Sequence, residues 1–189
     1  MKRIAILASG SGTNAENIIR YFQKSPVAIV VLVLSNKKDA KVLERAKNHN
    51  IKSLTFNKKQ FIEEDEVLNI LKKEADFIVL AGFLLKVPEN IIKAFPQKII
   101  NIHPALLPKY GGKGMYGWHV HNAVIANKEK ETGITIHFVN ENYDEGNVIF
   151  QKTVSVTEND TPESIADKVH QLEYENFPKI IETVLLKNE

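Results

Sequence analysis

The sequence predicts an α/β fold built on a twisted, mostly parallel sheet with helices on both faces. Short apolar runs alternate with amphipathic segments through residues 1–104, which is the pattern of repeated βαβ units. Val27–Leu34 is apolar at every position, as expected of a strand covered on both faces. Gly10–Asn14 follows the first apolar run and directly precedes a helical pattern. Right-handed crossovers between parallel strands would make this fold Rossmann-like.

The expected elements of the first part follow the order βαβαβαβαβ. The helical patterns carry apolar stripes and terminal signals: Asp39 fits an N-cap position, and Pro88 fits a first helical turn. The strands are expected at residues 4–8, 27–34, 52–56, 76–81 and 99–102, and the helices after Asn14, after Asp39, across Phe61–Leu71 and over Pro88–Phe95.

The pattern changes after residue 104. A glycine- and proline-rich loop is expected at 105–117, a helix at 119–126, and an antiparallel pair of strands at 133–139 and 147–156. A last helix should start at Thr161-Pro162-Glu163 and run to about Leu186. We expect it to break at Pro178, because proline lacks the N–H that an interior helical residue donates.

Composition excludes several classes of function. The 189 residues contain no cysteine, so disulfides, thiolate catalysis, iron–sulfur clusters and cysteine-based zinc sites are absent. The formal net charge of +2 argues against a nucleic-acid-binding protein. Val27–Leu34 is the longest strongly apolar run, far short of the roughly 20 residues that span a membrane, and Ile4–Ala8 is too short for the core of a signal peptide. We therefore expect a cytoplasmic globular domain with no membrane partner.

The turn Gly10–Asn14 is a candidate phosphate site. In open parallel sheets, ligands bind beyond the carboxyl ends of the strands, and the free N–H groups of a helix N-terminus favour an anion. The turn is incomplete as a dinucleotide fingerprint, because Ala15 stands where a third glycine is required and Asp39 is the nearest acidic residue. A tight turn that binds no ligand is the alternative.

A second candidate site lies at the carboxyl end of the last parallel strand. Strand alternation puts Asn101 and His103 on the same side. Asparagine can donate a hydrogen bond to an oxyanion and histidine can move a proton near neutral pH, a combination suited to carbonyl chemistry. His137 and Asp144 add to this set, and a carboxylate beside His103 should orient the ring and raise its pKa. The alternatives are a structural strand-end histidine and a turn aspartate before a glycine.

The chain resembles the phosphoribosylglycinamide formyltransferases, a family of folate-dependent enzymes of purine synthesis. The matching segments follow in order along nearly the whole chain: Ser9–Asn14, Ala81–Phe83, Asn101–Pro108, His137–Val139, Tyr143–Gly146 and Gln171–Glu173. The string from Asn101 to Pro108 is the most specific, since it is typical of folate formyltransferases as a group. The resemblance implies a formyltransferase fold with an antiparallel C-terminal strand element. It also implies a single domain over 1–189, with a phosphate-binding half at 1–103 and a catalytic and folate-binding half at 104–189.

The resemblance further implies a reaction, in which the amine of glycinamide ribonucleotide attacks the formyl carbon of 10-formyltetrahydrofolate, the co-substrate. Asn101 and protonated His103 would stabilise the tetrahedral oxyanion, Asp144 would favour the protonated histidine, and His137 would support them. The proton lost by the amine would reach the departing folate nitrogen through His103 or a bound water. Neither a covalent enzyme intermediate nor a metal would be needed.

Binding roles are implied by the same match. The substrate phosphate would be held by Gly12, Thr13 and Asn14, the ribose by His170, Gln171, Leu172 and Glu173, and the folate by Lys59, Leu84, Leu85, Lys86, Val87, Asn101, Asn140, Glu141, Asn142, Tyr143 and Asp144. The segment Gly111–Gly117 is longer than in the family's shorter members, and its four glycines predict a mobile lid.

Other functions fit parts of the pattern. A formyltetrahydrofolate deformylase would use water as the acceptor, and a methionyl-tRNA formyltransferase would carry a tRNA-binding domain that this length and charge do not suggest. A non-catalytic phosphate- or nucleotide-binding module would need only the glycine turn. His119 and His121 could suggest a metal, but no convincing third ligand accompanies them, so none is expected. The expected partners are the two small-molecule substrates, with no nucleic acid, in a monomer or homodimer.

Overall fold

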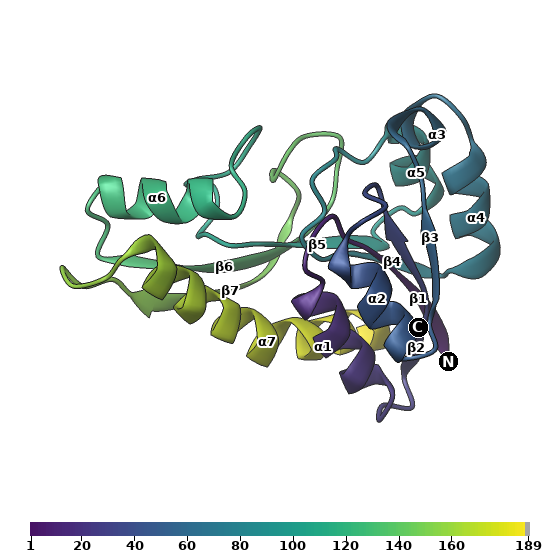
Figure 1. Ribbon diagram of the computed structural model, residues 1–189, viewed down its shortest axis with the longest axis horizontal. Coiled ribbons are helices and arrows are strands. Elements are labelled where there is room, and N and C mark those ends of the chain that lie inside the picture. The colour runs from purple at the N-terminus through teal and green to yellow at the C-terminus, as the bar shows by residue number, and fades with distance from the viewer. Residues whose placement is uncertain (188–189) are drawn as a thin grey trace. The chain divides into compact units, whose positions relative to one another are not determined.

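The computed structural model describes residues 1–187 and contains within them seven strands and seven helices (Figure 1). The strands are hydrogen-bonded in the order β3-β2-β1-β4-β5-β6-β7. Two compact units divide the chain, one made of Met1–Ile100 with Pro178–Glu189 and the other of Asn101–Phe177. The strand order confirms a mostly parallel α/β sheet with an antiparallel C-terminal element.

The first unit is built on a parallel sheet. Its strands are β1 (Lys2–Leu7), β2 (Ala28–Ser35), β3 (Lys52–Thr55) and β4 (Phe77–Leu80), followed in strand order by β5 (Ile99–His103). β1 pairs in parallel with both neighbours, so that Ile6 lies opposite Val33 of β2 and Val79 of β4. These three side chains are completely buried. The apolar run noted in β2 therefore reflects a strand covered on both faces.

Helices cover both sides of this first sheet. α1 (Thr13–Phe22) and α2 (Lys41–Asn48) lie together on one side, while α3 (Lys58–Ile62), α4 (Glu66–Glu74) and α5 (Glu89–Ala94) group on the other (Figure 1). The apolar stripe of α1 buries Ala15, Ile18, Ile19 and Phe22, whereas the short helices α3 and α5 each bury one apolar side chain, Phe61 and Ile91. This arrangement places the N-terminus of α1 directly after the carboxyl end of β1.

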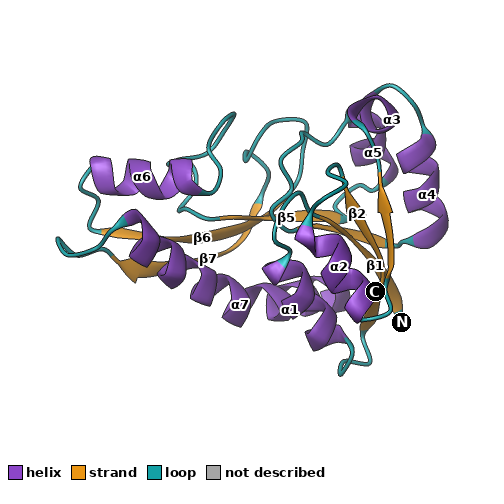
Figure 2. Ribbon diagram, viewed as in Figure 1, coloured by secondary structure: helices purple, strands orange, loops and turns teal. Residues whose placement is uncertain are grey.

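The second unit combines the end of β5 with an antiparallel pair. β6 (Glu131–Phe138) and β7 (Val148–Ser155) lie side by side (Figure 2). Ile134 lies opposite Lys152, and the register shifts between Ile136 and His137. β6 is buried along most of its length, whereas β7 is the largely exposed edge strand. α6 (Trp118–Ala126) and most of α7 (Pro162–Lys187) complete the unit. None of the helices within residues 1–187 is long and apolar enough to span a membrane.

Two predictions about helix boundaries are wrong. Asp39 does not cap α2, because Ala40 is the N-cap residue and the N–H of Val42 is satisfied by the Gly10 carbonyl at 3.2 Å. The helix expected across Phe61–Leu71 divides into α3 and α4. A capping box explains the start of α3: the Asn57 side chain accepts from the Gln60 N–H at 2.9 Å, and the Gln60 side chain accepts from the Asn57 N–H at 2.8 Å.

The break expected at Pro178 is also wrong, since α7 continues through it to Lys187. An interior proline costs a helix about 3 kcal/mol. Phe177 and Ile181, on either side of it, are fully buried, and burying such a side chain contributes roughly 1.5–3 kcal/mol. The packing of this face therefore offsets the missing hydrogen bond.

Candidate active site

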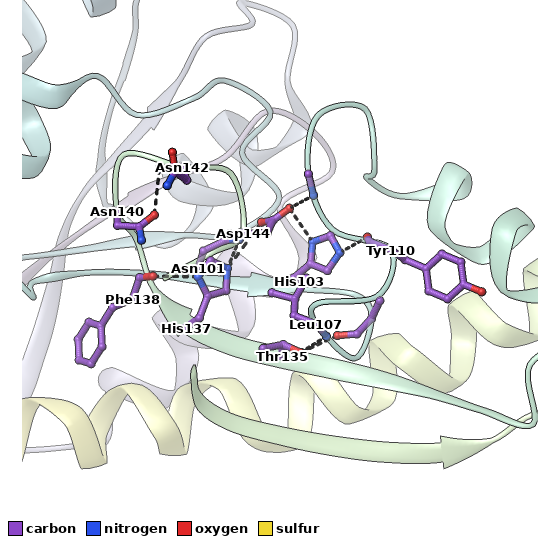
Figure 3. A network of polar contacts seen from close by, with 12 residues as sticks. Asn101, His103, Leu107, Tyr110, Thr135, His137, Phe138, Asn140, Asn142 and Asp144 are labelled. Atoms are coloured by element: carbon purple, nitrogen blue, oxygen red, sulfur yellow. Dashed lines mark hydrogen bonds and ion pairs between the residues drawn. The ribbon is translucent and has the colours of Figure 1, made fainter. Parts of the chain in front are cut away.

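The candidate site begins at the end of β5, which carries Asn101 and His103 two positions apart. His103 is buried and Asn101 is half-buried. His137, near the end of β6, is also buried, and Asp144 lies in the loop that joins β6 to β7. Figure 3 shows these four side chains converging, as the sequence predicted. All four belong to the second unit.

Each ring nitrogen of His103 faces a polar group, but only Nε2 forms a hydrogen bond in the neutral ring. Its Nε2 lies 2.7 Å from the Tyr110 carbonyl, which can only accept, so Nε2 carries the proton and donates. Its Nδ1 lies 3.6 Å from Asp144 Oδ2. Burial lowers the pKa of His103, and although Asp144 and the Tyr110 carbonyl act in the opposite direction, burial is the larger effect. The expectation of a raised pKa is therefore wrong in its net direction, and the resting ring is neutral at neutral pH.

His137 fixes the orientation of Asn101. The Nδ1 of His137 lies 2.9 Å from the Phe138 carbonyl and must donate to it, which leaves Nε2 as an acceptor. Asn101 Nδ2 donates to that Nε2 at 3.2 Å. The amide of Asn101 is thereby held with its nitrogen in the cluster, where its second N–H can serve an oxyanion.

Asp144 completes the cluster from a strained backbone position. Its φ of 55° lies in the left-handed region, which aspartate tolerates better than most residues. Its Oδ2 accepts from the Gly112 N–H at 3.0 Å, and its Oδ1 lies 3.6 Å from His137 Nε2. Burial raises the pKa of Asp144, but His137 and His103 in their protonated forms, together with the Gly112 N–H, act in the opposite direction and outweigh it, so the net pKa is lowered. The carboxylate is therefore ionised at neutral pH.

A second layer of hydrogen bonds holds the segment after His103. The Thr135 hydroxyl donates to the Ala105 carbonyl at 2.7 Å and accepts from the Leu107 N–H at 3.0 Å (Figure 3). Gln151 Nε2 donates to that hydroxyl at 2.9 Å and to the Leu107 carbonyl at 3.0 Å. Sequence reasoning missed Thr135 and Gln151, because single polar residues in strands carry no pattern that distinguishes them.

The glycine turn of the first unit is shaped by close packing. Gly12 has a φ of 74°, and a Cβ there would lie 2.5 Å from the Val42 side chain, so only glycine fits. Arg45 Nε donates to the Ser11 carbonyl at 2.8 Å, which fixes the turn from α2. Thr13 and Asn14 follow as the first residues of α1, where the free N–H groups of the helix favour an anion.

Ser9, at the start of the glycine turn, forms hydrogen bonds to the loops that contain Asn36 and Leu84. From the sequence, Ser9 was assigned no role of its own. Its hydroxyl donates to Asn36 Oδ1 at 2.6 Å and accepts from the Leu84 N–H at 3.0 Å. The glycine turn and the first residue of the predicted folate segment are thus tied together. Within that segment Leu84 and Lys86 are exposed, Leu85 is half-buried and Val87 is buried.

The remaining predicted ligand residues fall into three places. Lys59 is exposed and pairs with Glu64 at 2.9 Å, so no contact brings it to another predicted residue. Asn140–Asp144 forms the loop of the second unit, where Asn140 Oδ1 accepts from the Asn142 N–H at 3.0 Å, and Glu141 and Tyr143 are exposed. The predicted ribose segment lies on α7, with His170 and Gln171 exposed, Leu172 half-buried and Glu173 buried.

His119 and His121 lie on α6 and differ in environment. His119 is exposed, whereas His121 is buried and its pKa is lowered to about 4, chiefly by burial. Within residues 1–187, no group of three histidine, aspartate or glutamate side chains is placed to hold a metal ion.

Comparison with known proteins gives one consistent result. The model of the formyl transferase family matches residues 2–181. A chloroplastic phosphoribosylglycinamide formyltransferase of Arabidopsis thaliana is 41% identical over 95% of this chain and 64% of its own length. A second plant relative, from Vigna unguiculata, is 38% identical over 97% of this chain, which spans 61% of that relative. The phosphoribosylglycinamide formyltransferase of Bacillus subtilis is 35% identical over 98% of this chain and 95% of its own length.

Solved structures agree with these relatives. The crystal structure of phosphoribosylglycinamide formyltransferase from Bacillus halodurans is 38% identical, with a TM-score of 0.90 over 100% of this chain and 97% of that chain. The glycinamide ribonucleotide transformylase 1 of Geobacillus kaustophilus gives a TM-score of 0.89 at 34% identity. The chain therefore belongs to the formyl transferase family, among the phosphoribosylglycinamide formyltransferases.

Proposed function

We propose that the chain transfers the formyl group of 10-formyltetrahydrofolate to the amine of 5'-phosphoribosylglycinamide, a step of purine biosynthesis. One observation carries the proposal: the buried His103 and His137 and the half-buried Asn101 and Asp144 form a single cluster of polar contacts (Figure 3). The cluster offers an amide donor, a neutral imidazole and a carboxylate, which are the groups that amine attack on a formyl carbon requires.

The reaction starts with His103 neutral. The substrate amine attacks the formyl carbon, a carbon–nitrogen bond forms, and the carbonyl electrons move to the oxygen. The attacking nitrogen loses a proton to His103 Nδ1, the ring atom that does not donate to Tyr110. The imidazolium so formed lies 3.6 Å from the ionised Asp144, which stabilises it. A lowered pKa suits this role, because a base must be unprotonated before it acts.

Collapse of the intermediate completes the transfer. Asn101 donates to the oxyanion, and a preorganised donor of this kind contributes about 3 kcal/mol to the transition state. The oxygen lone pair re-forms the carbonyl, the bond to the folate nitrogen breaks, and that nitrogen takes the proton from His103, directly or through a water. The products are the formylated glycinamide and tetrahydrofolate, and the neutral imidazole is restored.

Binding is assigned to the remaining predicted residues. Gly12, Thr13 and Asn14 hold the substrate phosphate at the N-terminus of α1. His170–Glu173 contact the ribose, and Leu84–Val87 with Asn140–Asp144 contact the folate. Lys59 stays a candidate folate contact, which requires it to leave Glu64. We further propose one functional domain over 1–189, acting in the cytoplasm as a monomer or homodimer. Its phosphate-binding half, 1–103, ends on Asn101 and His103, and its catalytic and folate-binding half, 104–189, supplies the other two residues of the cluster.

The test is turnover of the purified protein on 10-formyltetrahydrofolate, with and without glycinamide ribonucleotide. We expect folate deformylation only when the ribonucleotide is present. Equal turnover with water alone would replace the proposal with a deformylase. Phosphate-ligand binding without any turnover would replace it with a binding module.

A further inference from the structure

We infer that the segment Tyr110–Gly112 is a main-chain clamp that positions His103 and Asp144 for catalysis. Two of its backbone groups reach the two residues. The Tyr110 carbonyl accepts from His103 Nε2 at 2.7 Å, and the Gly112 N–H donates to Asp144 Oδ2 at 3.0 Å. A stretch of three residues therefore holds both members of the pair from one side (Figure 3). The kinetic consequences of the clamp depend on the proposed formyl transfer, but its effect on Asp144 does not.

The segment holds Tyr110 in a backbone conformation that a bulky side chain does not favour. Tyr110 has a φ of 56°, which is rare for a bulky side chain, and Gly112 has a φ of 93°. Strain of this kind persists only where the surrounding structure imposes it, and it concentrates at functional sites. Here the strained residue is Tyr110, whose carbonyl binds His103, whereas Gly112 reaches its positive φ without strain and presents its N–H to Asp144.

Gly111 lets the segment approach the site. A Cβ at Gly111 would lie 2.6 Å from Leu107 Cδ2 and 3.4 Å from Asp144 Cβ. The middle of the clamp thus lies directly against the aspartate, with no space for a side chain. Gly111 thus serves close packing, and Gly112 supplies the N–H that binds Asp144. The mobile lid expected over Gly111–Gly117 stays a prediction.

The Tyr110 side chain anchors the clamp from outside the site. Its hydroxyl donates to Glu129 Oε1 at 2.9 Å and accepts from Asn127 Nδ2 at 3.0 Å. Both partners follow the C-terminus of α6. The segment is therefore tied down at its start, and its carbonyl is directed at His103 by contacts that touch no catalytic group.

The clamp determines which atoms can react. Because Nε2 of His103 donates to Tyr110, Nδ1 is left as the base beside Asp144. The groups that face Asp144 are His103 from β5, His137 from β6 and the Gly112 N–H from the loop. Of these, the Gly112 N–H cannot titrate, so it stabilises the carboxylate at every pH. Gly112 is a positioning residue in this account, since it acts through Asp144.

The chain provides a matched pair of glycines to test the clamp. Gly112 and Gly114 have φ values of 93° and 87°, and a Cβ at either would meet nothing within 4 Å. Gly112→Ala and Gly114→Ala therefore introduce similar backbone strain without a clash, but only Gly112 binds Asp144. Gly112→Asn provides a rescue, because asparagine tolerates positive φ far better than alanine.

The primary measurement is a carboxyl ¹³C NMR titration of Asp144 in the full chain, assigned with Asp144→Asn. We expect Gly112→Ala to raise the pKa of Asp144 by about one unit and Gly114→Ala to leave it unchanged, with Gly112→Asn close to wild type. Equal pKa values in the two alanine variants would overturn the inference. This readout needs no activity, so it decides the clamp even if the proposed reaction fails.

Steady-state kinetics give the second readout. In Gly112→Ala we expect kcat to fall about tenfold while both KM values stay within about twofold, because the clamp orients reacting groups without contacting substrate. A loss confined to KM, or an equal loss of kcat in Gly114→Ala, would contradict a positioning role.

Discussion

Replacing Asp144 with asparagine removes one charge from the cluster and preserves its size. The carboxylate lies 3.6 Å from His103 Nδ1, so at an effective dielectric constant of about 20 it stabilises an imidazolium by about 4.6 kcal/mol. Asparagine keeps an acceptor for the Gly112 N–H and tolerates the left-handed φ, so folding should be preserved. At about 1.4 kcal/mol per factor of ten, the lost stabilisation corresponds to a fall in kcat of about 10³-fold.

The assay is steady-state formyl transfer followed by the absorbance change of the folate, with thermal unfolding as a check on integrity. Glu145→Gln is the matched control, because it makes the same charge change at the next residue, which is exposed. We expect wild-type kcat in the control and KM values within a few-fold in both variants. A kcat within threefold of wild type in Asp144→Asn, with the fold intact, would refute the role given to the carboxylate.

Three further predictions concern the cluster, the glycine turn and a buried histidine. Asn101→Ala should lower kcat by about 10²–10³-fold with little change in KM, measured by the same assay, because it removes an oxyanion donor; a loss confined to KM would contradict this. Gly12→Ala should lower the free energy of unfolding in urea by more than about 2 kcal/mol, because its Cβ would lie 2.5 Å from the Val42 side chain. Gly82→Ala is the control: Gly82 has a φ of 71° but no such contact, so this variant should lose only about 1 kcal/mol. His121 has a pKa lowered from 6.5 to about 4, so as the pH falls the unfolded state binds this proton before the folded state does. The free energy of unfolding should therefore drop by about 3 kcal/mol between pH 6.5 and 4. His121→Leu should flatten this dependence of stability on pH.

Much of the fold could be predicted because its signals are local. The apolar run that became β2 marks a strand covered on both faces, and the stripe of Ile18, Ile19 and Phe22 marks the buried side of α1. Two of the errors occurred where tertiary contacts replaced local signals. Asp39 has the residue type of an N-cap, but the Val42 N–H in the first turn of α2 donates to the Gly10 carbonyl instead. Pro178 stays within α7 because Phe177 and Ile181 beside it are buried.

The side chains of the cluster could be predicted for similar reasons. Asn101 and His103 share a side by strand alternation, and Asp144 was a candidate from the loop after the strand of His137, a role that the resemblance also implied. The groups that hold these side chains in place could not be predicted. The Tyr110 carbonyl and the Gly112 N–H belong to the main chain, so no residue type indicates their role. Nor does spacing reveal how deeply a side chain is buried, which is why the lowered pKa of His103 was not anticipated.

The central claim is that the formyl carbon passes from folate nitrogen to the substrate amine. The most direct measurement is ¹³C NMR of a reaction with 10-[¹³C]formyltetrahydrofolate, glycinamide ribonucleotide and catalytic amounts of the protein. We expect the label to appear in the formamide of the ribonucleotide, at a rate that falls about 10³-fold in Asp144→Asn. Label recovered as formate, or left on the folate, would contradict it.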